Sequence, residues 1–413
     1  MTPDTASAYV PDAASASAYV PASASAYVPD AAPASVPASA SVPDSASVLG
    51  RRTLARGALL AAGGVLFSAT AAPAATASHT RAAALAPRPR LRLPAPTGPH
   101  PVGLRTVHLT DPSRTDPWVG GVRELMLTVL YPARSVRGCP RAPQLTPAAA
   151  RVFAAYAPRV HQGLPEEGAV DWGAVLTHGH VDAPPLPGRR PVLLYSPGGG
   201  DSRTLGTSLA EDLASHGRVV VLVDHPGDAS QVELPGGMRT TVLYGPPDPA
   251  TFRTMIDTRV ADLRCVLDRL GDLSLAPVMD PDRIGAYGHS AGGTAAVYAA
   301  RADGRIRAVA NLEGYLDLDP LDGFDRPLLL FRTDGFEDAA RIERSWCGLP
   351  GRRARLADAA HWAFTDYAAL VPRLQAAGLV TGATRAALVG TGDPARTTAA
   401  VRRRLGAFFS RRP

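Results

Sequence analysis

The sequence predicts an α/β protein in which one domain is built on a mostly parallel central sheet with helices on both faces. Between residues 101 and 413, short apolar runs typical of buried strands alternate with amphipathic helical patterns. Such an alternation requires crossover connections, which place successive strands in parallel. A second observation is the run GHSAGG at Gly288–Gly293. It directly follows an apolar run and has the small residues that a sharp strand-to-helix turn requires.

Seven apolar runs are expected to form the strands. In chain order they are GLRTVHLTD (103–111), RELMLTVLYPA (123–133), PVLLYS (191–196), RVVVLVD (218–224), RIGAYG (283–288), RAVANL (307–312) and RPLLLFR (326–332). The first two are expected to pair as an antiparallel hairpin, and the others to be buried. One long helix is expected where apolar residues recur at helical spacing, at Phe252, Met255, Ile256, Val260, Leu263, Leu267 and Leu270. The segment Thr146–Leu186 has one helical pattern followed by loops, and we interpret it as a cover for a functional site.

The chain before residue 101 is expected to contribute nothing to this domain. Residues 1–50 repeat a motif around SASAYVP and predict a disordered low-complexity extension. Residues 51–77 begin with paired arginines, continue with a weakly apolar run and end in small residues, which indicates a signal peptide of the twin-arginine type. Residues 78–100 are rich in proline and arginine and predict a tether. We therefore expect a secreted or extracytoplasmic protein.

Composition argues against two classes of partner. The formal net charge is +6 and the chain has no lysine, while its arginines are scattered rather than gathered on one face, so nucleic-acid binding is not expected. The apolar run at 58–72 is too short and too rich in glycine and alanine for a stable membrane span. Nothing in the sequence indicates an oligomeric state.

Metal binding is not expected either. The three cysteines, Cys139, Cys265 and Cys347, have no CxxC spacing, and His178 and His180 in THGHVDA have no neighbouring ligand pair, so a surface loop is favoured for them. If the protein is exported, one disulfide could form between Cys139 and Cys347, because Cys265 lies on the apolar side of the expected helix. No metal or organic cofactor is implied.

Ser290, at the centre of GHSAGG, is the candidate nucleophile. A serine hydroxyl needs a histidine to take its proton and a carboxylate to orient that histidine. In α/β hydrolases the acid and then the histidine follow the serine in the chain, and His361 is the one histidine well beyond Ser290. Two acids end strand-like runs at suitable places, Glu313 after RAVANL and Asp334 after RPLLLFR, and both remain candidates.

The oxyanion of an acyl-transfer reaction needs backbone N–H donors. One is expected from Ala291, the residue after the nucleophile, and the other from the glycine loop Pro197–Gly200 after PVLLYS. Asp224 and His225 end a strand before the serine and are expected to brace that loop. Trp346 and Trp362 are equally compatible with lining an acyl pocket and with packing beside the site.

The stretches VLLYSPGGGDSRT, DHPG, GHSAGG, NLEGY and AHWAFTDY, in that order, resemble the platelet-activating-factor acetylhydrolase family of α/β hydrolases and its bacterial esterase and lipase relatives. The resemblance runs from about Gly103 to Tyr367. It implies an α/β-hydrolase fold, a triad of Ser290, His361 and Glu313, and an oxyanion hole of Gly199 and Ala291. The chain has glutamate where the family commonly has aspartate, which keeps Asp334 as an alternative acid.

These features predict a serine hydrolase that cleaves carboxylic esters, of lipids or of small acyl groups, through an acyl-enzyme. A peptidase and a lactone or polyester hydrolase remain open within the enzyme class. The alternative from another class is a non-catalytic binding or cell-wall protein of the same fold, which only the Ala-, Ser- and Pro-rich start of the chain favours. Acyl-chain length is not indicated.

Overall fold

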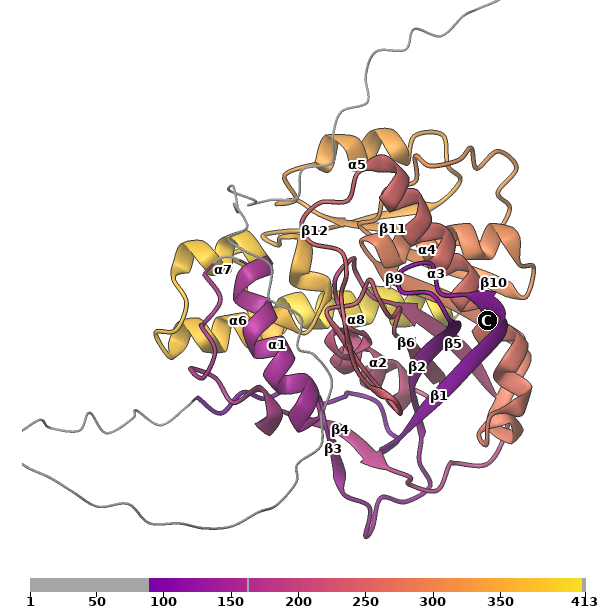
Figure 1. Ribbon diagram of the computed structural model, residues 1–413, viewed down its shortest axis with the longest axis horizontal. Coiled ribbons are helices and arrows are strands. Elements are labelled where there is room, and N and C mark those ends of the chain that lie inside the picture. The colour runs from indigo at the N-terminus through magenta and orange to yellow at the C-terminus, as the bar shows by residue number, and fades with distance from the viewer. Residues whose placement is uncertain (1–88, 162, 411–413) are drawn as a thin grey trace, which may run out of the picture. The chain divides into compact units, whose positions relative to one another are not determined.

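A ten-stranded mixed sheet is the framework of the chain (Figure 1). The structure, a computed structural model, describes residues 89–161 and 163–410. The low-complexity extension and the signal peptide expected from the sequence lie outside these residues. Of the segment expected to be a tether, residues 89–100 are described, and Leu91 and Leu93 among them are buried in the core. No helix in the described part of the chain is long and apolar enough to cross a membrane.

The strands follow the order β12-β11-β10-β9-β5-β6-β2-β1-β4-β3 across the sheet. Their bounds are β1 (Val102–Thr115), β2 (Val122–Pro132), β3 (Arg141–Pro143), β4 (Leu176–Val181), β5 (Arg190–Ser196), β6 (Val219–Val223), β9 (Met279–His289), β10 (Ile306–Leu312), β11 (Leu328–Thr333) and β12 (Arg352–Leu356). The six neighbouring strands β12, β11, β10, β9, β5 and β6 pair in parallel, whereas β2 is antiparallel to both β1 and β6. A separate antiparallel hairpin is formed by β7 (Gln231–Leu234) and β8 (Gly237–Thr240). Each of the seven runs expected to be a strand lies in this sheet.

Helices connect the strands and cover the sheet. The α-helices are α1 (Pro147–Val160), α2 (Thr207–Ser215), α3 (Pro249–Arg269), α4 (Ala291–Ala302), α5 (Ala339–Ser345), α6 (Tyr367–Ala376), α7 (Gly382–Val389) and α8 (Pro394–Ser410). Short 3₁₀ helices are η1 (Trp172–Ala174), η2 (Arg203–Gly206), η3 (Leu270–Asp272), η4 (Ala276–Val278) and η5 (His361–Phe364). The expected long helix is α3, whose first turn is capped by the Asp248 carboxylate, which accepts from the N–H groups of Ala250 and Thr251.

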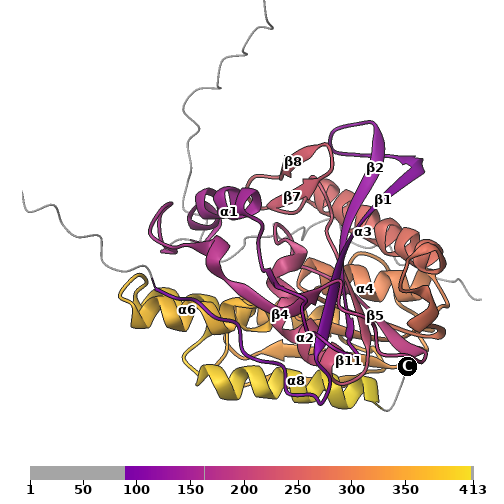
Figure 2. The ribbon, with the colours of Figure 1, turned by 90° about the horizontal axis from the view of Figure 1, so that it is seen from below.

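Both faces of the sheet are covered, as the alternation of buried residues along β5 shows. Val192 and Leu194 belong to the same core cluster as residues of α3 and α4, whereas Leu193 and Tyr195 belong to the cluster that contains residues of α2 and α8. Figure 2 shows α3 and α8 on opposite sides of the strands. This arrangement confirms the predicted α/β-hydrolase architecture, a mostly parallel sheet between two helical layers.

The segment between β2 and β5 differs from the prediction of one helix followed by loops. Its helix is α1, but the residues predicted as a surface loop around His178 and His180 form strand β4, which pairs in parallel with β1 and antiparallel with β3. The strand is stabilised because the buried carboxylate of Glu211 accepts hydrogen bonds from the backbone N–H groups of His178 and Gly179. The pattern THGHV is too polar and contains a glycine, so it carries little strand signal.

The three cysteines are free. Cys265 is buried on α3, as expected, whereas Cys347 is exposed and Cys139 is partly buried. The structure therefore does not contain the Cys139–Cys347 disulfide that the sequence suggested. The Cys139 thiol donates a long contact to the carbonyl of Arg137 instead.

Candidate active site

The candidate site lies where the parallel strands end. The carboxyl ends of neighbouring parallel strands meet at one edge of the sheet, which is where α/β proteins place their sites. The loops that follow β5, β9 and β10 begin with Pro197, Ser290 and Glu313 respectively. Because β5 and β10 are the two neighbours of β9, these three loops lie side by side.

Ser290 occupies the turn between β9 and α4 with a backbone strained in the way this motif requires. Its φ is 53° and its ψ is −125°, in a region that residues other than glycine rarely adopt. A Cβ atom on Gly288 would lie 2.2 Å from the backbone of Gly292, and one on Gly292 would lie 2.0 Å from the carbonyl oxygen of Ser196. No side chain fits at either position. The glycines therefore allow a turn tight enough to leave Ser290 partly exposed at the edge of the sheet.

His361 and Glu313 form a buried hydrogen-bonded pair. His361 Nδ1 lies 2.8 Å from Glu313 Oε2, and the Glu313 side chain is fully buried. The other carboxylate oxygen, Oε1, accepts from the backbone N–H of Thr333 at 2.5 Å and from its hydroxyl at 2.8 Å. These donors hold Glu313 in one orientation, so that it keeps the proton of His361 on Nδ1 and leaves Nε2 as an acceptor.

Register places this pair beside the serine. His289, the last residue of β9, is opposite Leu312, the last residue of β10, so Ser290 and Glu313 each follow directly on a paired position. The Nε2 atom of His289 lies 3.0 Å from the carbonyl oxygen of His361, and the two imidazole rings are 4.5 Å apart. Through this contact with the backbone of His361, His289 helps to position that residue.

The alternative acid, Asp334, has a different function in the structure. It is exposed, and its carboxylate accepts from the backbone N–H groups of Asp358 and Ala359 in the loop before His361. Asp334 therefore orders the loop that carries His361. The carboxylate that contacts the imidazole belongs to Glu313.

The pKa of His361 is lowered from its ordinary value of 6.5. The largest cause is burial, followed by the neighbouring imidazole of His289, whereas the Glu313 carboxylate acts in the opposite direction. The ring of Phe336 stacks on that of His361 with a centroid distance of 4.3 Å and an interplanar angle of 17°. An imidazole that is neutral at pH 7 is the form that can accept a proton.

The glycine loop after β5 adjoins the first turn of α4. A Cβ atom on Gly199 would lie 3.7 Å from Cβ of Ala291, and Gly199 is exposed although Pro197 and Gly198 are buried. Ala291 is the first residue of α4, and the first N–H groups of a helix have no partner within it. The geometry therefore places two backbone segments with available N–H groups next to Ser290.

The C-terminal half of α1 lies over this loop. The hydroxyl of Tyr156 is 3.3 Å from where a Cβ atom on Gly200 would be. His161, just after the helix, packs its ring edge-to-face on Trp362 at 4.6 Å, and burial lowers its pKa to about 4. Trp362 is thus part of the wall beside His361. Trp346, the other tryptophan considered, is buried and donates its Nε1–H to the carbonyl of Gly314, which makes it a packing residue.

Sequence reasoning did not identify Tyr156, Phe336 or the contact made by His289. Tyr156 and Phe336 are aromatic residues in stretches without a motif. The sequence indicates them only through their position, because Tyr156 lies in the segment expected to cover the site and Phe336 lies in the loop that contains Asp334. Asp224 and His225, expected to brace the glycine loop, do contact residues around it, but with separate partners. Asp224 accepts from Arg203, and His225 bonds to Ser196 and to Asp262.

The fold and the arrangement of these residues define an α/β hydrolase. Comparison with protein-family models gives no match. A probable 1-alkyl-2-acetylglycerophosphocholine esterase from Arthroderma benhamiae is 30% identical over 274 residues, in an alignment that covers 62% of this chain and 68% of the relative. A solved structure of a ferulic acid esterase from Streptomyces cinnamoneus is similar, with a TM-score of 0.65 and 35% identity over 78% of this chain and 93% of that one. The chain therefore belongs to the esterase family that resembles platelet-activating-factor acetylhydrolase, and it is a carboxylic-ester hydrolase.

Proposed function

We propose that this esterase works by nucleophilic catalysis, with Ser290 as nucleophile, His361 as general base and Glu313 as the acid that orients His361. The observation that carries the proposal is the 2.8 Å contact between His361 Nδ1 and Glu313 Oε2, directly beside a serine at φ 53°. Gly199 and Ala291 are proposed to donate the backbone hydrogen bonds of the oxyanion hole.

In the acylation step, Ser290 Oγ attacks the ester carbonyl carbon while His361 Nε2 takes its proton. The carbonyl π electrons move to the oxygen, which becomes an oxyanion and accepts from the N–H groups of Gly199 and Ala291. The intermediate then collapses, and the leaving alcohol takes the proton from His361. Water repeats the sequence on the acyl-enzyme and releases the carboxylic acid. The Glu313 side chain, hydrogen-bonded to Nδ1, stabilises the imidazolium that forms on His361.

We propose esters of small acyl groups as substrates. One relative is named for an acetyl-bearing glycerophosphocholine and the similar structure for ferulic acid, and both names contain a compact acyl group. Lipid esters with a short acyl chain belong to the same class. We also propose that the enzyme acts outside the cytoplasm. The support for this is the arrangement of Arg51, Arg52 and the apolar run that follows them.

The test is hydrolysis of p-nitrophenyl esters from acetate to palmitate by the full-length protein, with methyl ferulate and a 1-alkyl-2-acetylglycerophosphocholine as further substrates. We expect kcat/KM to be highest for acyl chains of about two to four carbons and to fall by at least about tenfold at palmitate, because a pocket that fits a short acyl group has no room for the additional methylenes. An optimum at palmitate would overturn the small-acyl proposal in favour of a lipase. No hydrolysis of any ester by folded protein would return the non-catalytic alternative.

The pH dependence of kcat/KM tests the role of His361. The base must be neutral, and its pKa is lowered. We therefore expect kcat/KM for p-nitrophenyl acetate to be constant above about pH 7 and to decline about tenfold per pH unit below an apparent pKa that lies under 6.5. Acid also destabilises the fold, because the unfolded chain binds protons at His161 and His361 that the native state does not bind. Return to pH 7 after each acid incubation must therefore restore full activity. A flat profile down to pH 4 would contradict the assignment.

A further inference from the structure

One buried arginine donates to two carbonyl oxygens of the glycine loop, one of which, that of Gly198, also accepts from the N–H of Asp201 at 3.2 Å. Arg259, on α3, has a side chain with no exposed surface. Its Nη1 donates to the carbonyl oxygen of Pro197 and its Nη2 to that of Gly198 at 2.9 Å. These carbonyls belong to the two peptide units that immediately precede Gly199 along the chain. The Gly198 carbonyl is part of the same peptide plane as the N–H of Gly199, so fixing that oxygen fixes the direction of the N–H.

The carboxylate of Asp228 contacts both the Arg259 side chain and the backbone of Gly200. Its Oδ2 accepts from Arg259 Nε, and its Oδ1 accepts from the backbone N–H of Gly200 at 3.1 Å. The carbonyl of Gly200 in turn accepts from the N–H of Ser230 at 2.8 Å. Arg259 and Asp228 form a nearly dry ion pair, with side-chain exposures of 0% and 2%. The N–H of Gly199 donates to no group among residues 89–161 and 163–410, although the Gly198 carbonyl and the Gly200 N–H on either side of it are both hydrogen-bonded.

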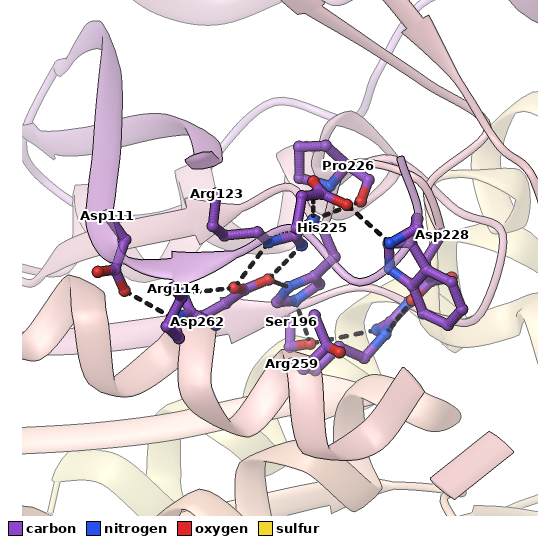
Figure 3. Close-up of polar contacts among 12 residues, drawn as sticks. Asp111, Arg114, Arg123, Ser196, His225, Pro226, Asp228, Arg259 and Asp262 are labelled. Atoms are coloured by element: carbon purple, nitrogen blue, oxygen red, sulfur yellow. Dashed lines mark hydrogen bonds and ion pairs between the residues drawn. The ribbon is translucent and has the colours of Figure 1, made fainter. Parts of the chain in front are cut away.

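Arg259 also contacts a second serine–histidine–acid arrangement, formed by Ser196, His225 and Asp262 and shown in Figure 3. Ser196 Oγ lies 2.9 Å from His225 Nε2, and His225 Nδ1 lies 2.9 Å from Asp262 Oδ2. Arg259 Nη1 donates to Ser196 Oγ at 3.3 Å. Ser196 and His225 have no exposed surface, so no substrate reaches them.

This buried arrangement has one consistent set of donors. Burial and, next, the guanidinium of Arg259 lower the pKa of His225, so its imidazole is neutral. Arg259 donates to Ser196, the Ser196 hydroxyl donates to His225, and His225 Nδ1–H donates to Asp262. Asp262 is compensated by the buried guanidinium of Arg123, whose Nη2 lies 2.6 Å from Asp262 Oδ2. This network of Asp262, His225 and Ser196 is therefore structural. It ends at Ser196, the residue that directly precedes the glycine loop.

From these contacts we infer that Arg259, held by Asp228, is a positioning residue that keeps the Gly199 N–H aimed at the oxyanion. The inference rests on the proposed function. An oxyanion hole accelerates the reaction because its donors are fixed before charge develops, so no reorganisation is needed in the transition state. Arg259 touches no substrate. It acts through the Gly198–Gly199 peptide.

The test compares Arg259→Lys and Arg259→Gln with the wild type, using p-nitrophenyl acetate. Lysine keeps the charge but lacks the planar fork that reaches Asp228 and two carbonyls at once. We expect kcat to fall about 10²-fold in both variants, the effect of losing one oxyanion donor, with KM changed less than about threefold. Affinity for a trifluoromethyl ketone, which forms an oxyanion on the serine, should fall by a similar factor. A purely structural role predicts no change in kcat per folded molecule.

Arg402 provides the matched control. It is a buried arginine that also donates to backbone carbonyls, those of Pro94, Ala95 and Ser208, but it makes no contact with the glycine loop. Arg402→Lys and Arg402→Gln should lower Tm by amounts similar to those for the Arg259 variants and leave kcat within about twofold of the wild type. If the Arg259 variants retain kcat, or if the Arg402 variants lose as much, the inference is wrong.

Asp228→Asn tests the same contact if the Arg259 variants do not fold. Asparagine still accepts one hydrogen bond but weakens the hold on Arg259, and we expect kcat to fall about tenfold with KM nearly unchanged. An unchanged kcat would overturn the inference. Failure of the proposed function itself looks different, because the wild type would then neither hydrolyse esters nor react with a fluorophosphonate at Ser290.

Discussion

Replacing Ser290 with alanine should abolish ester hydrolysis while leaving the fold intact. We expect kcat for p-nitrophenyl acetate to fall at least about 10⁴-fold, since the remaining His361 and oxyanion donors cannot form an acyl-enzyme. Alanine fits in the space of serine, and the backbone of residue 290 keeps its φ of 53° because neighbouring strands impose it. Tm should therefore change by no more than about 3 °C. Measurement is by initial rates together with thermal unfolding.

The control for Ser290→Ala is Ser274→Ala. Ser274 is exposed and accepts one hydrogen bond from Arg105, and it precedes the amino end of β9, whereas Ser290 follows the carboxyl end of that strand. This variant should hydrolyse esters at the wild-type rate and should react with a fluorophosphonate at Ser290, as located by mass spectrometry of the labelled peptide. Equal activity in Ser290→Ala and wild type would assign the nucleophile to another residue.

Glu313→Gln should be the second most damaging substitution, and Asp334→Asn should be nearly neutral. The amide oxygen of glutamine would take the two donors of Thr333, so its NH₂ group would face His361 Nδ1. Nδ1 would then have to be the acceptor, which moves the imidazole proton to Nε2 and prevents it from accepting the proton of Ser290. We expect kcat to fall about 10³- to 10⁴-fold, the range known for the wrong tautomer in a triad. Steady-state kinetics at pH 7 to 8 measure this loss.

The comparison with Asp334 decides between the two acids that the sequence left open. In Asp334→Asn the side-chain oxygen can still accept from Asp358 and Ala359, so the loop before His361 is retained. Its kcat should remain within about threefold of the wild type. The reverse outcome, an active Glu313→Gln and an inactive Asp334→Asn, would transfer the role of triad acid to Asp334.

The main strands and α3 were predictable because strong periodic patterns mark them. β5 and β6 contain uninterrupted apolar runs, and α3 repeats apolar residues at helical spacing for about four turns. The strands outside the seven expected runs, β3, β4, β12 and the β7–β8 hairpin, are short, and β3, β4 and β12 lie at the margins of the sheet. These strands form because their backbones pair with neighbouring strands, and the sequence does not show which strands are neighbours. They contain polar residues, so no apolar pattern marks them.

The sequence could predict those residues of the site whose position is set by a local turn or by chain order. GHSAGG marks Ser290 because the turn admits only small residues, and chain order narrows the search for the histidine. The identity of the acid depended on which strand end lies beside His361, and that is a property of sheet order. The sequence pattern alone did not distinguish Glu313 from Asp334 as the acid, and only the family resemblance favoured Glu313.

The network beneath the glycine loop was missed although it left a trace. Arg259 and Asp262 fall among the apolar positions Ile256 and Leu263 on the face of α3 that packs against the sheet. A charged pair on the buried face of an amphipathic helix is unfavourable unless it has partners, so such a pair indicates a hidden polar network. Its partners, Asp228, His225 and Arg123, come from distant strands and loops, and no spacing in the sequence relates them.

The segment that carries α1 is joined to the main sheet through the strands on either side of it. β3 precedes α1 and β4 follows it in the chain, and the two strands pair with one another, Arg141 opposite His180 and Pro143 opposite Leu176, while β4 also pairs with β1. The two ends of this segment are therefore held together at the edge of the sheet, and the hydroxyl of Tyr156 lies 3.3 Å from where a Cβ atom on Gly200 would be. We expect that changing which acyl groups this esterase accepts requires substitutions on the side of α1 that faces the glycine loop, such as at Tyr156, rather than changes at the ends of the segment.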